Sequence, residues 1–182
     1  MADKNGPWTV LRKAIRYQTK WLTIEEDEVI HPDGKKGVFA VAEILPGISI
    51  LPIDDNGDAY LIEEFRYALK RKSIEASSGA IELGEMPLNA AKRELEEELG
   101  IQAQDWVELG VVHPLTSNIH SPAYLFLARK LTFTRAHPER NEIITPVKMP
   151  FEKAVKMVMK SEIVHAPSCV LILKAKEFYL RK

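Results

Sequence analysis

The chain has 182 residues, with 25 basic and 26 acidic side chains and a formal net charge of −1 at pH 7. This length fits one domain with a small additional segment, and it allows a sizeable core without disulfides. The balanced, interspersed charge lacks the basic surface of a nucleic-acid-binding protein. No apolar run reaches the roughly 18 residues of a membrane span, and MADKNGPW is no secretory leader, so we expect a soluble, cytoplasmic protein.

An antiparallel β segment is expected over residues 1–44. Short apolar and aromatic stretches fill residues 8–30, Pro32-Asp33-Gly34 marks a turn, and residues 37–42 predict the returning strand. A sheet this thin has no core by itself. It must therefore pack on its own domain or on a second subunit.

A β-hairpin is predicted next. Residues 48–53 favour a strand, 54–58 carry the Asn-Gly turn signal, and 59–67 favour the partner strand. Arg66 stands near the end of that partner strand, close in sequence to the acidic stretch that follows. A solvated surface role is the plain interpretation of this arginine, but a guanidinium fork also suits a pyrophosphate group.

Residues 79–101, GAIELGEMPLNAAKRELEEELGI, predict a helix with two distinct faces. Glu94, Glu97 and Glu98 stand at i, i+3 and i+4 and so share one face. Their mutual repulsion is relieved if a cation sits among them, and hard oxygen ligands suit Mg²⁺ or Mn²⁺. Arg93 pairs with Glu97 at i,i+4, which gives it the task of orienting a carboxylate. A separate apolar stripe can pack on a core, and it consists of Leu88, Ala91, Leu95 and Leu99.

The second half of the chain predicts two strands, an edge strand and two helices. The strands cover residues 106–113 and 123–128, and Pro146 places 143–147 at a sheet edge. Helices are expected over 150–160 and 166–179. His113 and His120 are loop histidines at and within the polar stretch 114–122, and they lack metal-ligand spacing. The lone Cys169 falls in an apolar helix where packing is its expected role. This order indicates a mixed α/β fold with helices on a mostly antiparallel or mixed sheet.

The helical stretch resembles the Nudix box, G-x5-E-x7-R-E-U-x-E-E-x-G-U, in which U is aliphatic. Every constrained position matches: Gly79, Glu85, Arg93, Glu94, Leu95, Glu97, Glu98, Gly100 and Ile101. Because residue type and spacing must agree over the whole stretch, the signal is specific. The resemblance implies an α/β/α sandwich with a mixed sheet over residues 45–182, preceded by the N-terminal β segment.

The likeness extends to the ADP-ribose pyrophosphatase branch of that family. It rests on the N-terminal segment, the P-D-G turn, the E-x-F-R sequence that ends at Arg66, the box and a later acidic loop. In that branch the N-terminal strands help to form a homodimer, so the resemblance implies dimerisation through residues 1–44. One departure is that relatives usually have E-x-P-A-G before the box, whereas this chain has Glu75-Ala76-Ser77-Ser78-Gly79.

Functional residues follow from the resemblance position by position. The metal ligands would be Glu94, Glu97, Glu98 and the carbonyl of Ser78; Arg66 would contact the diphosphate, with Glu85 also near the substrate. Trp21 and Phe39 match aromatic positions that hold adenine in relatives, although strand packing explains them equally well. The catalytic set would be Glu97, Arg93 and Glu142, and Glu139 or a box glutamate is the alternative base.

The implied reaction is metal-dependent hydrolysis of a nucleoside diphosphate sugar, with ADP-ribose, cleaved to AMP and ribose 5-phosphate, as the first choice. Mg²⁺, or Mn²⁺ in its place, is the expected cofactor. One alternative keeps the chemistry and changes the substrate to GDP-mannose or a broad range of such sugars. Another, from a different class, is a Nudix module that binds a nucleotide without cleaving it.

Overall fold

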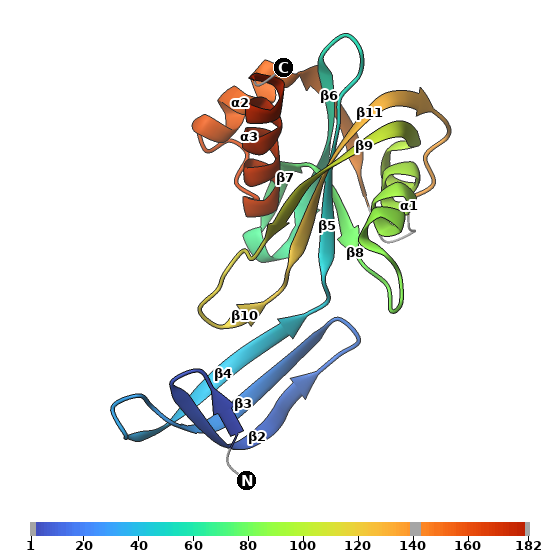
Figure 1. Cartoon of the computed structure of the whole chain (residues 1–182). Helices are drawn as coiled ribbons and strands as arrows, with labels where there is room; N and C mark the ends of the chain where they lie inside the picture. Colours follow the sequence, from blue (N-terminus) through green and yellow to red (C-terminus); the bar gives the residue numbers. More distant parts are fainter. Residues whose placement is uncertain (1–2, 139–142, 181–182) are drawn as a thin grey trace. The chain divides into compact units, whose positions relative to one another are not determined.

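The computed structural model describes residues 3–138 and 143–180, and the chain divides into two compact units. The N-terminal unit consists of Met1–Leu45 and His113–Pro122, and the main unit consists of Pro46–Val112 and Ala123–Lys182. Figure 1 traces both units in the colours of the sequence. No helix in the described residues is long and apolar enough to cross a membrane.

The N-terminal unit is one five-stranded sheet in the order β1-β2-β3-β4-β10. The strands are β1 (Asp3–Asn5), β2 (Trp8–Gln18), β3 (Leu22–Ile30), β4 (Lys36–Ile44) and β10 (Ile119–His120). The first four pair antiparallel, which confirms the expected antiparallel segment. The fifth strand pairs parallel to β4 and comes from the stretch between Val112 and Ala123 that was predicted to be a loop. A two-residue strand carries no periodicity from which it could be predicted.

The main unit contains a mixed sheet and an antiparallel sheet. The mixed sheet has the order β8-β5-β11-β9, with β8 (Ser77–Ala80), β5 (Gly47–Pro52), β11 (Ala123–Phe133) and β9 (Ile101–Val112). Only β5 and β11 run parallel. The antiparallel sheet has the order β12-β6-β7, with β12 (Thr145–Pro150), β6 (Asp58–Arg66) and β7 (Arg71–Glu75), and the short helix η1 (Tyr67–Leu69) joins β6 to β7. The edge position predicted for the strand containing Pro146 is confirmed.

Helices cover both faces of the mixed sheet (Figure 1): α1 (Pro87–Leu99) packs on one face, and α2 (Phe151–Met159) and α3 (Ala166–Leu180) lie on the other side. Successive strand residues point to opposite faces. Leu125 and Leu127 of β11 therefore join the core under α3, while Phe126 and Ala128 join the core under α1. This arrangement confirms the predicted α/β/α sandwich.

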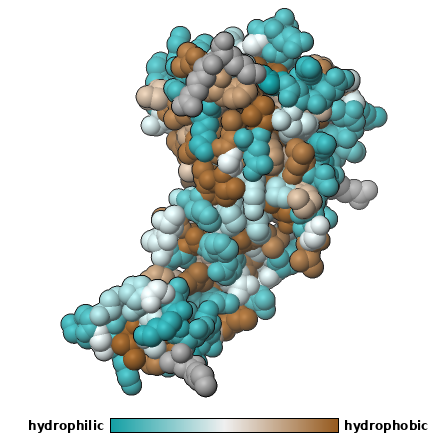
Figure 2. Space-filling view, viewed as in Figure 1, coloured by the Kyte–Doolittle hydropathy of each residue, from teal (hydrophilic) through white to brown (hydrophobic). Residues whose placement is uncertain are grey.

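The surface is largely hydrophilic on the face shown in Figure 2, with hydrophobic residues interspersed. Among the exposed apolar side chains, Ile15, Tyr17 and Val38 belong to the N-terminal unit, and each is more than half exposed at 58%, 58% and 57%. In the described residues this unit is a single sheet with no helix across it. Its apolar side chains therefore find no second layer within the unit.

Candidate active site

Helix α1 holds the acidic residues in place because its other face is buried. Ala91 and Leu95 are fully buried against the mixed sheet. The helix begins at Pro87, which suits a first turn, and ends before Gly100, whose φ of 61° allows its N–H to reach the carbonyl of Glu96 at 2.9 Å. The remaining face presents the carboxylates predicted from the sequence.

Gly79 makes room for the side chain of Glu94. A Cβ at position 79 would stand 2.6 Å from Cγ of Glu94 and nearer still to its carboxyl carbon and Oε1. Side chains do not approach a Cβ this closely, so only glycine permits the observed position of Glu94. The glycine that opens the box therefore determines where one of the predicted ligands lies.

Arg93 contacts three glutamates. Its Nε and Nη2 donate to Oε1 and Oε2 of Glu85 at 3.1 and 3.0 Å, and Nη2 also donates to the carbonyl of Ala80 at 3.1 Å. Nη1 donates to Glu94 Oε1 at 2.7 Å and to Glu97 Oε2 at 3.3 Å. The hydrogen bond with Glu85 raises the pKa of Arg93, and the same bond lowers the pKa of Glu85. Sequence spacing pointed to Glu97 as the partner, but the two-pronged contact is with Glu85.

The acidic cluster has the chemistry of a divalent-metal site, although its carboxylates do not converge on one point here. In the described part of the chain, no three His, Cys, Asp or Glu side chains are grouped so as to hold a metal ion. The Arg93 guanidinium lies between Glu94 and Glu97, where it balances their charge. The donors are nonetheless hard oxygens, Glu98 is only 4% exposed, and Gly79 leaves room for the carboxylate of Glu94. These residues fit Mg²⁺ or Mn²⁺ in kind.

Ser78, the fourth predicted ligand, lies in β8 opposite Ser49 of β5. Its hydroxyl donates to the carbonyl of Ala76 at 2.9 Å and lies 3.3 Å from the hydroxyl of Ser49. The side chain is therefore engaged within the sheet, and the predicted role concerns its main-chain carbonyl, which directly precedes Gly79.

Arg66 is the last residue of β6, and two carboxylates hold it. Its Nε and Nη2 donate to Oε2 of Glu75 at 3.1 and 2.7 Å, and Nη1 lies 2.6 Å from Oε2 of Glu64. Burial lowers the pKa of Arg66, but the hydrogen bond with Glu75 and the charges of Glu75, Glu64 and Glu98 outweigh it, so the net shift is upward. The charge of Glu98 on α1 contributes to this upward shift of the pKa.

The remaining predicted residues fall in two places. Trp21 and Phe39 belong to the N-terminal unit, where Trp21 is 55% exposed and Phe39 packs edge-on against Trp8 at 5.3 Å between ring centroids. Glu139 and Glu142 lie outside the described residues. The roles assigned to all of them stay predictions.

Glu75 is the site residue that sequence reasoning left without a role. It is 3% exposed, and it fixes Arg66 from the end of β7. The sequence offered one signal, because Glu75 opens the stretch that matches the E-x-P-A-G segment of relatives. Its pairing with Arg66 could not be found from spacing: the register places Glu75 opposite Ile62 and Arg66 opposite Arg71, so the long side chain of Arg66 has to reach along the sheet to meet Glu75.

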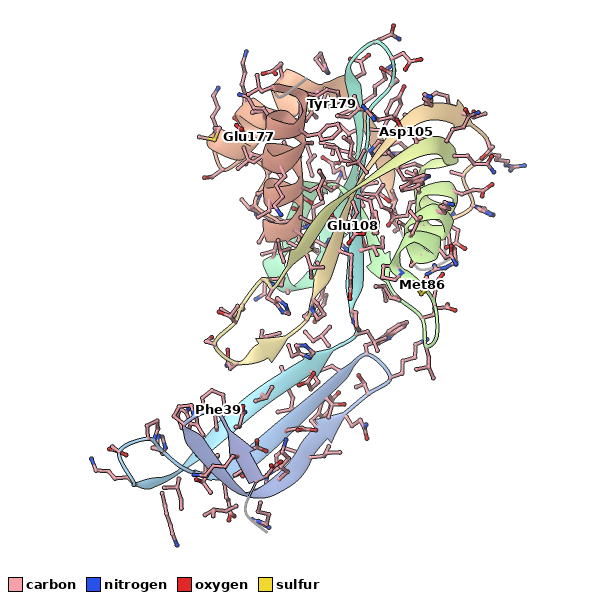
Figure 3. All side chains as sticks on the ribbon, in the orientation of Figure 1. Phe39, Met86, Asp105, Glu108, Glu177 and Tyr179 are labelled. Carbon is pink, nitrogen blue, oxygen red and sulfur yellow. The ribbon has the colours of Figure 1, made fainter. Side chains whose placement is uncertain are left out.

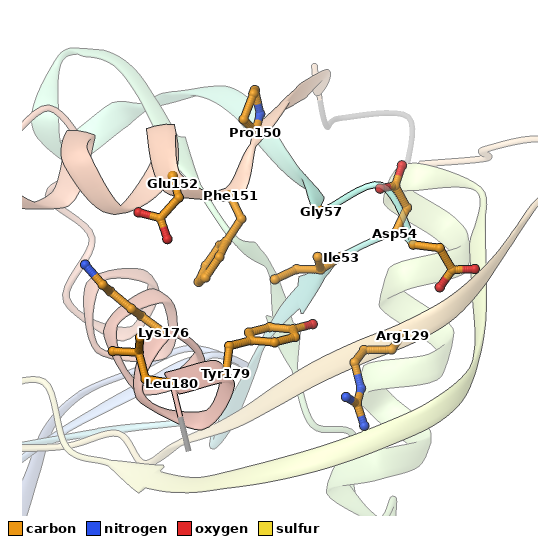
Figure 4. A pocket seen from close by; sticks show the side chains of 11 residues that line it. Ile53, Asp54, Gly57, Arg129, Pro150, Phe151, Glu152, Lys176, Tyr179 and Leu180 are labelled. Atoms are coloured by element: carbon orange, nitrogen blue, oxygen red, sulfur yellow. The ribbon is translucent and has the colours of Figure 1, made fainter. Parts of the chain in front are cut away.

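The main unit has two cavities of about 560 Å³ each outside the acidic face of α1. Figure 4 shows one, between the turn after β5, the start of α2 and the end of α3, with Phe151, Tyr179 and Arg129 on its walls. The other lies at the first turn of α1, and Figure 3 labels two of its lining residues, Met86 and Glu108. None of the predicted site residues that the structure describes lines either cavity.

The fold and the box helix define a hydrolase class, and comparison with known proteins identifies it. A model of the NUDIX domain matches residues 44–167, and a model of the nucleoside diphosphate sugar hydrolase N-terminal domain matches residues 8–41. The chain belongs to the Nudix family, as its box predicted. It is therefore an enzyme of the class that acts on pyrophosphate bonds.

Relatives support the same assignment. The chain is 26% identical over 173 residues to the ADP-ribose pyrophosphatase of Bacillus subtilis (strain 168), covering 93% of each chain. It is 29% identical over 149 residues to the ADP-ribose pyrophosphatase of Mycobacterium tuberculosis, covering 80% of this chain and 72% of that protein. A crystal structure of an ADP compounds hydrolase matches the fold with a TM-score of 0.84 at 21% identity, covering 97% and 96% of the two chains. The predicted resemblance to this branch is confirmed.

Proposed function

We propose that this chain is a metal-dependent pyrophosphatase of nucleoside diphosphate sugars, with ADP-ribose, cleaved to AMP and ribose 5-phosphate, as its first substrate. The observation that carries the proposal is the acidic face of α1, which bears Glu94, Glu97 and Glu98; Arg93 contacts Glu94 and Glu97, and Gly79 leaves room for the side chain of Glu94. Family membership supplies the reaction class, and the match of residues 8–41 to a sugar-nucleotide hydrolase segment supports the substrate class.

We assign the metal site to specific residues of the chain. Glu94, Glu97, Glu98 and the carbonyl of Ser78 would hold the cation, and the contacts of Arg93 with Glu94 and Glu97 would yield to it. When bound, a divalent ion supplies charge stabilisation and lowers the pKa of water.

The guanidinium of Arg66 would bind the diphosphate. Its side chain is 33% exposed even though it pairs with Glu64 and Glu75. Proton removal from water falls to Glu142, with Glu139 or Glu97 as the alternative bases.

The N-terminal unit supports the further proposal of a homodimer. Leu22 pairs with Ile44 and Phe39 pairs with Asp27, so Trp21 and Phe39 are separated along β4 by roughly 20 Å at about 3.3 Å per residue. Aromatic rings that stack lie about 4.5–7 Å apart. A single base that contacts both residues would therefore need Trp21 from one subunit and Phe39 from another. The exposed apolar side chains of this sheet favour such an association.

The test is release of AMP from ADP-ribose with Mg²⁺, beside GDP-mannose and a metal-free control. Glu98→Gln should lower kcat by at least about 100-fold, while the protein keeps its thermal stability. Glu96→Gln is the matched control on the same helix, because the side chain of Glu96 accepts a hydrogen bond from exposed Gln102 at 2.8 Å, and it should retain full activity. Calorimetric titration with Mn²⁺ gives a second readout, in which Glu98→Gln should weaken binding.

Each other result has a definite meaning. Turnover of GDP-mannose alone keeps the mechanism and changes the substrate. Tight nucleotide binding without any cleavage would indicate the non-catalytic module and overturn the proposal. Wild-type activity in Glu98→Gln would remove this residue from the metal site.

A further inference from the structure

The orientation of Arg66 depends on one carboxylate oxygen. Oε2 of Glu75 accepts from both Nε and Nη2 of Arg66, at 3.1 and 2.7 Å. The side chain of Glu75 is 4% exposed, whereas that of Arg66 is 33% exposed. The buried partner therefore holds the guanidinium from behind, and the exposed part of Arg66 is left for a ligand.

The same oxygen has a neighbour on another element. Nδ1 of His165, the residue that precedes α3, lies 3.5 Å from Oε2 of Glu75. Nδ1 also lies 2.8 Å from the hydroxyl of Ser168, and that hydroxyl accepts the N–H of Ala76 at 2.9 Å. Ser168 is fully buried. The first turn of α3 is thus joined to the end of β7, next to the carboxylate that holds Arg66.

The hydrogen bonds around Ser168 bear on the protonation of His165. The Ser168 hydroxyl accepts the N–H of Ala76 and still has its own proton to donate, and Nδ1 of His165 lies at hydrogen-bond distance from it. With that proton directed at Nδ1, the imidazole is neutral, Nδ1 is the acceptor and Nε2 carries the ring proton. Burial lowers the pKa of His165; Glu75 on β7 raises it and Arg66 on β6 lowers it further, and among the described residues these are the charged groups that act on the ring.

We propose that His165 is a positioning residue for Arg66, which acts through the shared oxygen of Glu75. While it is neutral, His165 accepts from Ser168 and leaves Oε2 to the guanidinium. Once protonated at Nδ1, it becomes a second cationic donor beside Oε2, competes with Arg66 for that oxygen and loosens the guanidinium. The inference rests on the proposed function, in which Arg66 binds the diphosphate.

The test compares KM and kcat for ADP-ribose between pH 5 and 8.5 in the wild type and in His165→Gln. In the wild type, KM should rise about tenfold as pH falls, because a charge-assisted contact is weakened. The glutamine can still accept from Ser168 but does not titrate, so its KM should stay near the high-pH wild-type value. His113→Gln, an exposed histidine of the N-terminal unit, is the matched control and should keep the wild-type curve.

A measurement on the wild type covers the case in which His165→Gln fails to fold. Imidazole ¹⁵N NMR should show the Nε2–H form at pH 8, and the midpoint of its titration should coincide with the pH at which KM changes. A midpoint elsewhere, or a KM curve that is identical in wild type and His165→Gln, would overturn the inference while AMP release continued. Absence of AMP release from the wild type would instead refute the proposed function.

Discussion

Replacing Gly79 with alanine separates function from stability. The new Cβ would stand 2.6 Å from Cγ of Glu94, and ordinary contact begins at 3.4 Å, so Cγ has to withdraw by about 0.8 Å and the carboxyl group by more. Metal ligands tolerate only about 0.2 Å of displacement, and a misplacement of about 1 Å costs on the order of 10²-fold in rate. The obstacle is the flexible end of a glutamate, so we expect a loss of only about 1 kcal/mol in folding stability.

The assay is kcat/KM for AMP release across a Mg²⁺ titration, paired with thermal unfolding. The matched control is Glu94→Ala, alone and combined with Gly79→Ala. Once the glutamate side chain is gone, the alanine has nothing to displace, so the double variant should be no slower than Glu94→Ala. If Gly79→Ala alone kept the wild-type rate at every metal concentration, Gly79 would not be what positions Glu94.

Three further substitutions test the contacts that hold the box residues in place. Gly100→Ala would place a Cβ 2.6 Å from the main-chain nitrogen of Ala136 at a φ of +61°, so urea titration should show a loss of about 1–3 kcal/mol or more; unchanged stability would contradict the close approach. Glu85→Gln removes a carboxylate whose pKa is lowered from 4.5 by the hydrogen bond with Arg93. The stabilisation that this carboxylate provides is therefore present above about pH 4.5 and is lost as the pH falls. The variant should have a lower Tm than the wild type at pH 7, and its Tm should decline less steeply below about pH 4.5. Arg93→Lys cannot span both oxygens of Glu85, and calorimetry should show a loss of about 1–3 kcal/mol, whereas full stability would mean that the fork is dispensable.

The sequence predicted those parts of the fold that have a local signal. Helix α1 runs from Pro87 to Leu99 because a proline, an apolar stripe and a terminal glycine mark it out within a single segment. The turn between β5 and β6 follows from Asn56-Gly57 in the same way, but the predicted hairpin pairing is wrong, because the two strands belong to different sheets and meet at an isolated bridge between Ile53 and Ala59. These features need no knowledge of distant residues.

Strands β7, β8 and β10 escaped prediction because pairing partners define them. Ser77 and Ser78 form a strand only against β5, and serine-rich stretches have little strand preference of their own. The site shows the same limit. Helical spacing correctly predicted the contact of Arg93 with Glu97, but the fork to Glu85 reaches a loop residue outside the helix, which only the folded chain brings near.

The strand β10 makes the N-terminal unit discontinuous in sequence. The chain passes between the two units three times, after Leu45, after Val112 and after Pro122. A cut at residue 45 would therefore not release a complete domain. It would remove β4 and leave β10, the strand that pairs parallel to it, attached to the main unit without its partner. Transplanting this unit onto another Nudix enzyme requires the 113–122 segment to move with it, so the two pieces of sequence form one exchangeable part.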